Sequence, residues 1–426
     1  MPSARILILT NSPLCRNPRV VKEATTLGHA GYEVTVLGIS NHLPSVAIDR
    51  DLVARSPFRH LSVDMLGRES SFPQRLAVWL RRLQHRAARE LCHRFHWQLA
   101  AALGPAESLL RAALRHPAEL IIAHNEIPHW CVSRLIAAGR RVAADIEDWH
   151  SEDLLPHERS GRPLRLLRAS ESYLLHHAAF TTTTSHALAN ALHARYGGRR
   201  PEVITNSFPL DPLPAPRSRL PAPDSPRLPP SFFWFSQTTG PGRGLELFLA
   251  AWSRTTQPSR LVLLGETRFG YRQRLLETLP ESFRSRVTFL PLVPPDQLPA
   301  LIARHDIGLA LEKDFIFNRD LTITNKILQY LNAGLAVVAS NTQGQREVLT
   351  HAPEAGLLVA LHETTTLTTQ LDTLLADPAH LDRRRLAARQ LAEQLYCWER
   401  EAPRLLALVA TALLPASGSP LPAPSA

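Results

Sequence analysis

The chain has 426 residues, 44% of them hydrophobic and 20% charged, a composition that excludes disordered, collagen-like and coiled-coil proteins. Its net charge is +10, but 45 of the 48 basic residues are arginines and 35 residues are prolines, a bias typical of GC-rich coding sequences rather than of nucleic-acid binding. The longest apolar stretch near an end, Leu405–Leu414, has about half the length of a spanning helix, and no signal-like segment precedes the first strand, so we expect a cytoplasmic protein without a nucleic-acid partner.

Residues 1–208 have the alternating pattern of an α/β domain. Arg5–Thr10 is an apolar run without period-two alternation, which predicts a strand buried on both faces. Asn17 and Pro18 are typical of the first residues of a helix, and this helix should end at Gly31. Further strands are predicted at Glu33–Leu37, Leu120–Ala123, Val142–Asp145, Phe180–Thr184 and Glu202–Thr205.

A proline-rich linker should follow, because residues 209–230 contain nine prolines in 22 positions. A second domain, residues 231–385, repeats the alternation. Its strands are predicted at Phe232–Phe235, Leu261–Leu264, Val287–Leu290, Ile307–Leu311 and Leu335–Ala339. The pattern predicts two doubly wound parallel sheets, with ligands bound in the cleft beyond the carboxyl ends of the strands. The Pro/Ser/Ala-rich residues 416–426 should form a disordered tail.

The segment from Asp306 to Ser340 reads as strand, loop, helix and strand. Thr324 can cap its helix, whose buried face would contain Ile327, Leu328 and Leu331. A helix N-terminus that carries Thr324, Asn325 and Lys326 is an anion site, because free amides and the helix dipole both favour negative charge. Lys326 is one of three lysines in the chain, and the alternative is an ordinary surface lysine.

Metal-binding patterns are weak in this sequence. The four cysteines are far apart and form no CxxC pair. Asp49-Arg50-Asp51 spells a DxD motif, but no strand is predicted directly before it, so we expect no metal there.

Four segments together resemble glycosyltransferase family 4, retaining enzymes of the two-domain GT-B fold. They are Arg5–Ser12 with the helix that follows, Leu120–Asn125, Val203–Ser207 and Asp306–Ser340, in the family's order and on both sides of a linker. The resemblance implies two Rossmann-like domains facing across a cleft, with a C-terminal helix, 386–415, that returns to the first domain. It also implies transfer of a sugar from a nucleoside diphosphate to a glycan, lipid-linked or small-molecule acceptor, without a cofactor.

The resemblance places the donor site in the second domain. Arg243, between Gly242 and Gly244, stands at the lysine of the family's diphosphate clamp, while Thr238 replaces its arginine; Lys326 could restore that cation. Leu321 and Gln329 replace the family's paired glutamates. The expected catalytic cations are thus Arg243 and Lys326, and the expected donor contacts are Gly242, Gly244, Glu312, Asp320, Thr324, Asn325 and Gln329.

The first domain would hold the acceptor. His124 matches a family histidine at the cleft edge, a catalytic position, although a strand-end histidine is otherwise often structural. Asp148 and His150 follow another strand and should face the acceptor. Their acidic surroundings also allow a metal site, but the spacing of these residues matches no regular metal-ligand pattern. Asn11, Asn17 and Arg19, after the first strand, complete the expected acceptor side.

Two rival functions remain open at this point. Thr238, Leu321 and Gln329 are compatible with an inactive relative that binds a nucleotide sugar. A sugar-nucleotide 2-epimerase shares the two-domain architecture and would convert its substrate without an acceptor.

Residues 74–97 predict a basic amphipathic helix. Leu76, Leu80, Leu83, Ala87 and Leu91 share one face, and Arg75, Arg82, Arg86 and Arg89 flank it. Such a helix either lies on an anionic membrane, on the inner face in this case, or packs its apolar face on the sheet of its domain.

Overall fold

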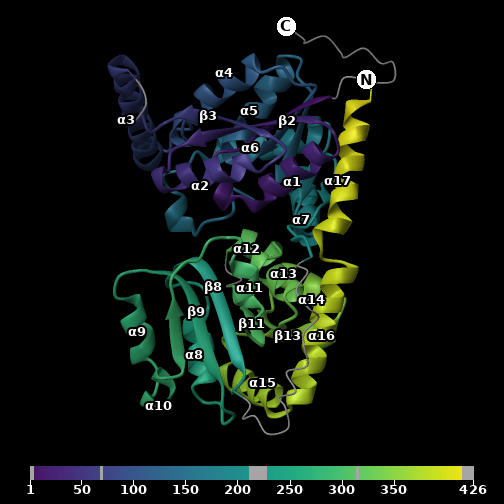
Figure 1. Ribbon diagram of the computed structural model, residues 1–426. Helices are drawn as coiled ribbons and strands as arrows, with labels where there is room; N and C mark the ends of the chain where they lie inside the picture. The colour runs from purple at the N-terminus through teal and green to yellow at the C-terminus, as the bar shows by residue number, and fades with distance from the viewer. Residues whose placement is uncertain (1–3, 68–70, 211–227, 313–315, 415–426) are drawn as a thin grey trace.

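The protein consists of two α/β domains, each built on one parallel sheet (Figure 1). The structure is a computed structural model that describes residues 4–67, 71–210, 228–312 and 316–414. The strand orders are β3-β2-β1-β4-β5-β6-β7 and β10-β9-β8-β11-β12-β13, and all strand pairs are parallel. In each sheet the chain first adds strands on one side of its first strand, β1 or β8, and then continues on the other side. This is the Rossmann-like order, so the predicted fold class of two doubly wound domains is confirmed.

The first sheet and its helices come from the N-terminal half. Its strands are β1 Arg5–Leu9, β2 Glu33–Ser40, β3 Arg59–Asp64, β4 Leu120–His124, β5 Val142–Ile146, β6 Thr181–Thr183 and β7 Glu202–Val203. Its helices are α1 Pro18–His29, α2 Leu43–Ala54, α3 Phe72–Phe95, α4 Ala106–Arg115, α5 Glu126–Ala137, α6 Leu164–His177 and α7 His186–Tyr196.

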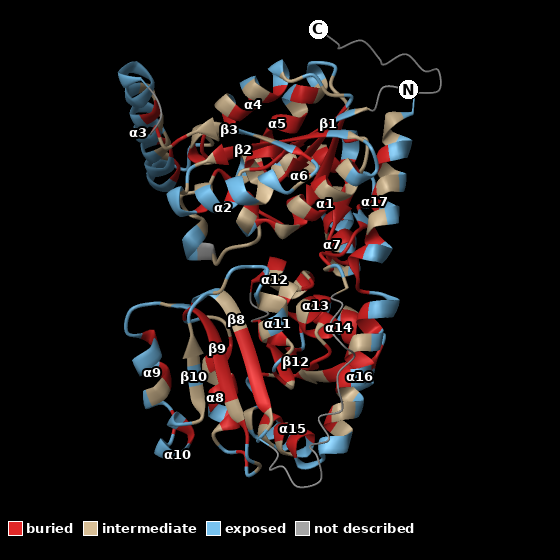
Figure 2. Cartoon of the chain, in the orientation of Figure 1, coloured by how far each residue is buried: buried red, intermediate tan, exposed pale blue. Residues whose placement is uncertain are grey.

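The second sheet is formed by β8 Ser231–Thr239, β9 Arg260–Thr267, β10 Val287–Leu290, β11 Ile307–Ala310, β12 Ala336–Ser340 and β13 Gly356–Val359. Its helices are α8 Leu245–Trp252, α9 Tyr271–Glu277, α10 Glu281–Arg284, α11 Leu298–Ile302, α12 Phe317–Leu321, α13 Asn325–Asn332, α14 Gln343–Thr350, α15 Thr364–Ala376 and α16 Pro378–Gln394. Large apolar side chains fill both faces of this sheet, and Figure 2 shows its central strands buried.

The apolar runs predicted every central strand, whereas β3 and β13 were not predicted. Both missing strands lie at the edge of their sheet. β3 has the sequence Arg-His-Leu-Ser-Val-Asp and none of its residues is fully buried. An edge strand has fewer neighbours to bury it, so its sequence carries less of the apolar signal.

The chain crosses between the domains twice, and the two crossings run side by side. Phe208 pairs with Cys397 in an isolated parallel bridge, and the Phe208 carbonyl accepts from the Trp398 amide at 3.0 Å. Residues 211–227, most of the expected 209–230 linker, lie outside the described residues, as do Pro415 and the expected 416–426 tail.

The expected return helix, 386–415, is divided in the structure. Residues up to Gln394 belong to α16, whose Ala388 and Leu391 lie in the core of the second domain. The following helix, α17 (Trp398–Leu413), returns to the first domain and lies beside α1 (Figure 1). Its Leu405 and Val409 belong to the same core cluster as Ile6 and Ile8 of β1. Among the described helices, none is both long and apolar enough to cross a membrane.

Candidate functional site

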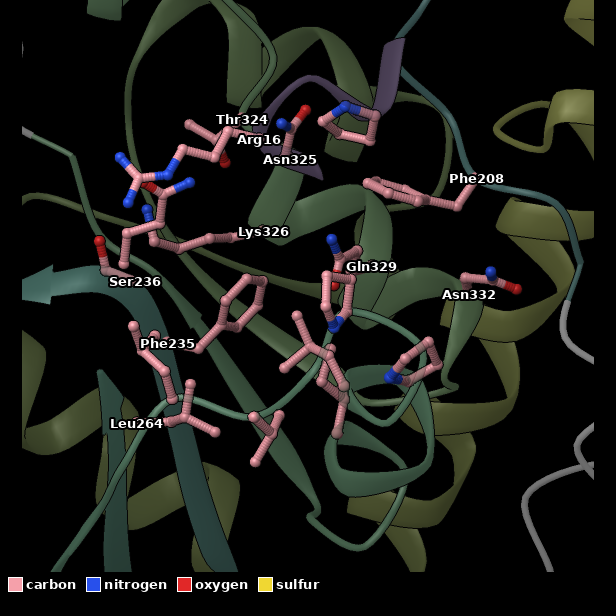
Figure 3. Close-up of a pocket in the computed structure, with 18 of the residues that line it drawn as sticks. Arg16, Phe208, Phe235, Ser236, Leu264, Thr324, Asn325, Lys326, Gln329 and Asn332 are labelled. Atoms are coloured by element: carbon pink, nitrogen blue, oxygen red, sulfur yellow. The ribbon is translucent and has the colours of Figure 1, made fainter. Parts of the chain in front are cut away.

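A pocket of about 580 Å³ lies between the two domains (Figure 3). One side is apolar and is built by the ends of β8 and β9 and the segment before and within α11: Phe235, Leu264, Leu292, Val293, Pro295, Leu298, Pro299 and Ile302. The opposite side is polar and is built mainly by α13: Glu312, Thr324, Asn325, Lys326, Gln329 and Asn332. The first domain and the first crossing add Cys15, Arg16, Pro18, Phe208 and Pro209.

Two cations flank one carboxylate at the polar side of this pocket. Lys326 Nζ lies 2.9 Å from Glu312 Oε1, and Arg243 Nη1 lies 3.7 Å from Glu312 Oε2. Burial alone would raise the pKa of Glu312, but the charges of Lys326 and Arg243 outweigh it and lower that pKa. The cluster therefore carries one excess positive charge; Lys326 and Glu312 line the pocket, and Arg243 lies behind Glu312.

The helix α13 presents its N-terminus to the same pocket. The Thr324 side chain accepts from the Ile327 amide, which confirms the predicted cap, and Ile327, Leu328 and Leu331 are buried as expected. Gln329 lines the pocket one turn further on, and its Oε1 is buried without a protein partner. A helix start, a lysine and an unsatisfied amide together make a site for an anionic, hydroxyl-bearing ligand.

The turn from β8 to α8 brings Arg243 to this cluster. Gly242 and Gly244 adopt φ of 85° and 77°, and a Cβ at Gly244 would lie 2.8 Å from Leu361 Cδ1. Both glycines thus shape the turn and do not line the pocket. Thr238, at the missing arginine of the clamp, is exposed near the end of β8.

Asp320, expected as a donor contact, lies elsewhere. Its carboxylate accepts from the Gln343 amide at 3.0 Å and from Gln343 Nε2 at 2.6 Å, so it holds the start of α14. Its neighbour Leu321 is buried against the core of the first domain. Of the two acidic residues expected as donor contacts, Glu312 lines the pocket and Asp320 does not.

Arg16 and Cys15 were not predicted as pocket residues. They lie in a short 3₁₀ turn, Leu14–Arg16, between β1 and α1, and Figure 3 shows Arg16 near Thr324 and Lys326. Their position at the carboxyl end of β1, directly before the predicted helix start, was a signal that could have identified them.

The DxD motif has a structural role at this turn. The Asp49 carboxylate accepts from the Cys15 amide at 2.8 Å and from the Leu14 amide at 3.2 Å, so it fixes the turn that carries Arg16. The described part of the chain contains no group of three or more His, Cys, Asp or Glu that could hold a metal.

His124 lies in a buried ionic network behind the strand ends and does not line the pocket. Its Nε2 is 2.6 Å from Glu23 Oε2, and its Nδ1 is 3.2 Å from Asp145 Oδ2; its side chain is 1% exposed. Arg19 binds Asp145 through two bonds of 2.7 and 2.6 Å and donates to the Ile204 carbonyl. The expected cleft contact of His124, and the expected acceptor contact of Arg19, are thus replaced by mutual neutralisation of buried charges.

The pKa values in this network follow from that pairing. Burial would lower the pKa of His124, but Glu23 and Asp145 raise it to about 10. Burial would raise the pKa of Asp145, but Arg19 and His124 hold it far below its usual range. Two cations and two anions balance here.

The other acceptor-side candidates have mixed placements. Asn17 caps α1 by accepting from the Val20 amide at 3.1 Å, as its sequence position predicted. Asn11 lies in the loop after β1, with Oδ1 buried and without a protein partner. His150 Nδ1 lies 3.5 Å from Glu126 Oε2, and its ring is 5.5 Å from that of His129.

Asp148 contacts the second domain. Its carboxylate accepts from Asn318 Nδ2 at 2.8 Å, and the same amide donates to Asp153 at 3.0 Å. Asn206, at the first crossing, similarly donates to Glu147 of one domain and to Asn325 of the other, at 2.9 and 2.8 Å. These bonds join the two domains, and the Asn325 side chain already accepts one of them from Asn206.

Two Rossmann-like domains, each with a parallel sheet, that face each other across a pocket have the architecture of the GT-B fold. Solved structures support this fold over nearly the full chain. Sucrose-phosphate synthase from Thermosynechococcus elongatus is 17% identical, with 96% of this chain and 98% of that chain covered and a TM-score of 0.67. HepE from Anabaena in complex with UDP is 18% identical, with 96% and 100% covered and a TM-score of 0.67. An α,α-trehalose-phosphate synthase from Burkholderia vietnamiensis is 12% identical, with 96% and 100% covered and a TM-score of 0.62.

The family assignment rests on the second domain. Residues 229–377 match the family model described as glycosyl transferases group 1. The match agrees with the resemblance inferred from the sequence, and it covers the second domain alone. No curated protein matches the chain.

Proposed function

We propose that this protein is a retaining glycosyltransferase of family 4 that transfers a sugar from a nucleoside diphosphate to a glycan, lipid-linked or small-molecule acceptor. The observation that carries the proposal is the open pocket lined by Lys326, Glu312 and the start of α13, with Arg243 beside Glu312 just outside the lining. The site is on the group 1 domain and at the carboxyl ends of its strands, where such folds bind ligands.

The chemistry requires a diphosphate to leave while positive charge develops at the anomeric carbon. Preorganised cations and helix amides stabilise that leaving group electrostatically. Lys326 and Arg243 supply the cations, with Glu312 holding both in place, and the α13 start supplies amide dipoles. Gln329 Oε1, unsatisfied in the pocket wall, can accept from a sugar hydroxyl of the donor.

The apolar side of the pocket fits the nucleoside. Phe235 and the residues around α11 form an apolar surface opposite the charged cluster, so the base and the diphosphate would lie on different surfaces of one cavity. The HepE structures contain UDP and UDP-glucose. We therefore choose UDP-sugars as the first donors to test.

Retention is proposed to occur by attack on the face from which the diphosphate departs. In that scheme a diphosphate oxygen takes the proton of the acceptor, so no protein base is needed. This agrees with the placement of His124, whose ring nitrogens both face carboxylates. The reaction needs no resident cofactor.

A donor and acceptor screen with mass-spectrometric detection of products tests the proposal. A transferase gives a glycosylated acceptor and a free nucleoside diphosphate, with the anomeric configuration of the donor retained. Conversion of the nucleotide sugar without an acceptor would instead identify a 2-epimerase. Donor binding without transfer or hydrolysis would identify the inactive binder that Thr238, Leu321 and Gln329 allow.

The proposed setting is the inner face of the membrane in the cytoplasm, where lipid-linked acceptors would be reached.

A further inference from the structure

The helix α3 turns its largest apolar side chains away from the protein. It stands at the edge of the first domain (Figure 1), and most of its surface is exposed (Figure 2). Its buried residues are small or medium in size: Val78, Ala88 and Cys92. One alternative from the sequence was that the leucine face of this helix packs on the sheet of its domain. The structure excludes this alternative, because Leu76, Leu80 and Leu83 are exposed.

The exposed apolar residues form one stripe. At 3.6 residues per turn they share one side of the helix, nearly opposite to the buried residues. Phe72 is 77% exposed and Trp79 is 55% exposed. We call this stripe the α3 apolar stripe; its members are Phe72, Leu76, Trp79, Leu80 and Leu83. The stripe extends over about 18 Å along the helix, so it is a continuous apolar surface and not a set of scattered apolar residues. A continuous exposed surface of this kind requires an explanation.

Arginines lie beside this stripe. Residues 72–95 contain six arginines and one acid, Glu90. Arg75 and Arg86 are exposed and flank the apolar stripe on one side. Arg82 and Arg89 donate to the carbonyls of Met65 and Ala102, so they also hold the helix to its domain. Arg75, Arg82 and Trp79 border a hollow of about 260 Å³ at the base of the helix.

A membrane surface is the partner that this combination fits. A partner protein on this stripe would need an acidic surface whose shape and charge positions match the flanking arginines. An anionic bilayer offers negative charge at any position, apolar depth for Leu80 and Leu83, and an interface for the amphipathic ring of Trp79.

We propose that α3 docks this protein on an anionic lipid bilayer, with the α3 apolar stripe in the interface and the arginines on the lipid headgroups. This docking does not depend on the donor pocket, because α3 contributes no residue to it.

Vesicle co-sedimentation of the full chain tests the docking. We expect binding to vesicles that contain phosphatidylglycerol, weaker binding at higher salt, and little binding to pure phosphatidylcholine. A triple variant, Trp79→Ala with Leu80→Ala and Leu83→Ala, should weaken binding by about ten-fold or more, since these side chains are exposed and alanine preserves the helix.

A charge variant of α3 and a matched control show whether binding depends on the arginines of α3 or only on the net charge of the protein. Arg75→Gln with Arg86→Gln should weaken binding at low salt by about ten-fold or more. Arg195→Gln with Arg254→Gln removes the same charge from exposed positions on other elements and should change binding less than about two-fold.

Several outcomes would overturn the proposal. They are equal binding to both lipids, absence of binding to either, or an equal effect of the charge variant and its control. Self-association that the triple variant abolishes, without vesicle binding, would identify the stripe as an interface between copies of the chain. Nucleoside diphosphate affinity, measured by calorimetry, should be unchanged in every α3 variant, so failure here is distinguishable from failure of the proposed function.

Discussion

Each domain has a cluster of charged side chains near the carboxyl ends of its strands, but only one cluster is open. In the first domain, Arg19 and His124 balance Glu23 and Asp145, and all four side chains are buried. In the second, Lys326 and Arg243 exceed the single charge of Glu312, and the cluster borders a pocket of about 580 Å³.

The comparison shows that position at a strand end is not sufficient for function. A balanced buried cluster leaves no charge for a ligand and acts on stability, whereas a cluster with excess charge at a cavity attracts an anion. The first cluster therefore acts on structure, and the second is the proposed donor site. Substitutions in the first cluster should lower stability and leave ligand affinity unchanged, whereas substitutions in the second should lower ligand affinity.

The largest expected effect is on stability, in the closed cluster. Asp145→Asn leaves Arg19 and His124 buried without their shared carboxylate, which should lower the free energy of unfolding by about 3–5 kcal/mol. Denaturant titration measures this, and calorimetry of the folded protein should give unchanged affinity for a nucleoside diphosphate. A stable variant with lost affinity would reverse the two assignments.

The next effect is on binding, in the open cluster. Lys326→Ala removes a charged partner of the diphosphate, worth about 1.5–3 kcal/mol, so affinity should fall by about ten-fold or more. Lys326→Arg, which keeps the charge, should lose less. Arg243→Ala should act in the same direction but more weakly, because the Arg243 side chain is 35% exposed.

A pH dependence should distinguish the closed cluster further. The pKa of His124 is raised to about 10 in the folded protein, above its unfolded value of about 6.5. Its contribution to stability is complete below about pH 6.5 and is lost as pH rises toward 10, with a slope of at most about 1.4 kcal/mol per pH unit.

The matched measurement is the unfolding midpoint of the wild type and of His124→Gln between pH 7 and 10, the window set by that pKa shift. Burial lowers the pKa of Lys22, which acts in the opposite direction, so the difference between the two proteins isolates His124. The fall should be shallower in the variant, and parallel curves would exclude the pairing.

The smallest effect concerns Arg16, which extends the open cluster across the domain interface. Arg16→Ala should weaken nucleoside diphosphate binding by roughly five-fold, about 1 kcal/mol, because the side chain is exposed and screened by solvent. Arg195→Ala, on α7, is the control and should leave affinity unchanged. If both variants bind equally well, the pocket is completed by the second domain alone.

Much of the fold could be predicted from the sequence, because central strands of parallel sheets are continuous apolar runs. The edge strand β3 was missed because its exposed position removes that signal, whereas β13 has the apolar sequence Gly-Leu-Leu-Val and was missed although the signal is present. Near the open cluster, Thr324, Lys326 and Gln329 are close in sequence on α13, so local helix rules placed them together.

The closed cluster could not be predicted in the same way. His124 is a strand-end residue by sequence, but its partners Glu23 and Asp145 come from α1 and β5, and only the tertiary structure shows that they meet. The exposed leucines of α3 are a similar case. The helical period gives the face correctly, but the direction in which that face points depends on how Val78, Ala88 and Cys92 pack.

The most direct test of the account is calorimetric titration of a nucleoside diphosphate, UDP first, into the wild type, Lys326→Ala and Asp145→Asn. The account predicts binding by the wild type, a loss of about ten-fold or more in Lys326→Ala, and unchanged affinity in folded Asp145→Asn. Unchanged affinity in Lys326→Ala, together with lost affinity in Asp145→Asn, would contradict the assignment of the open cluster to the donor.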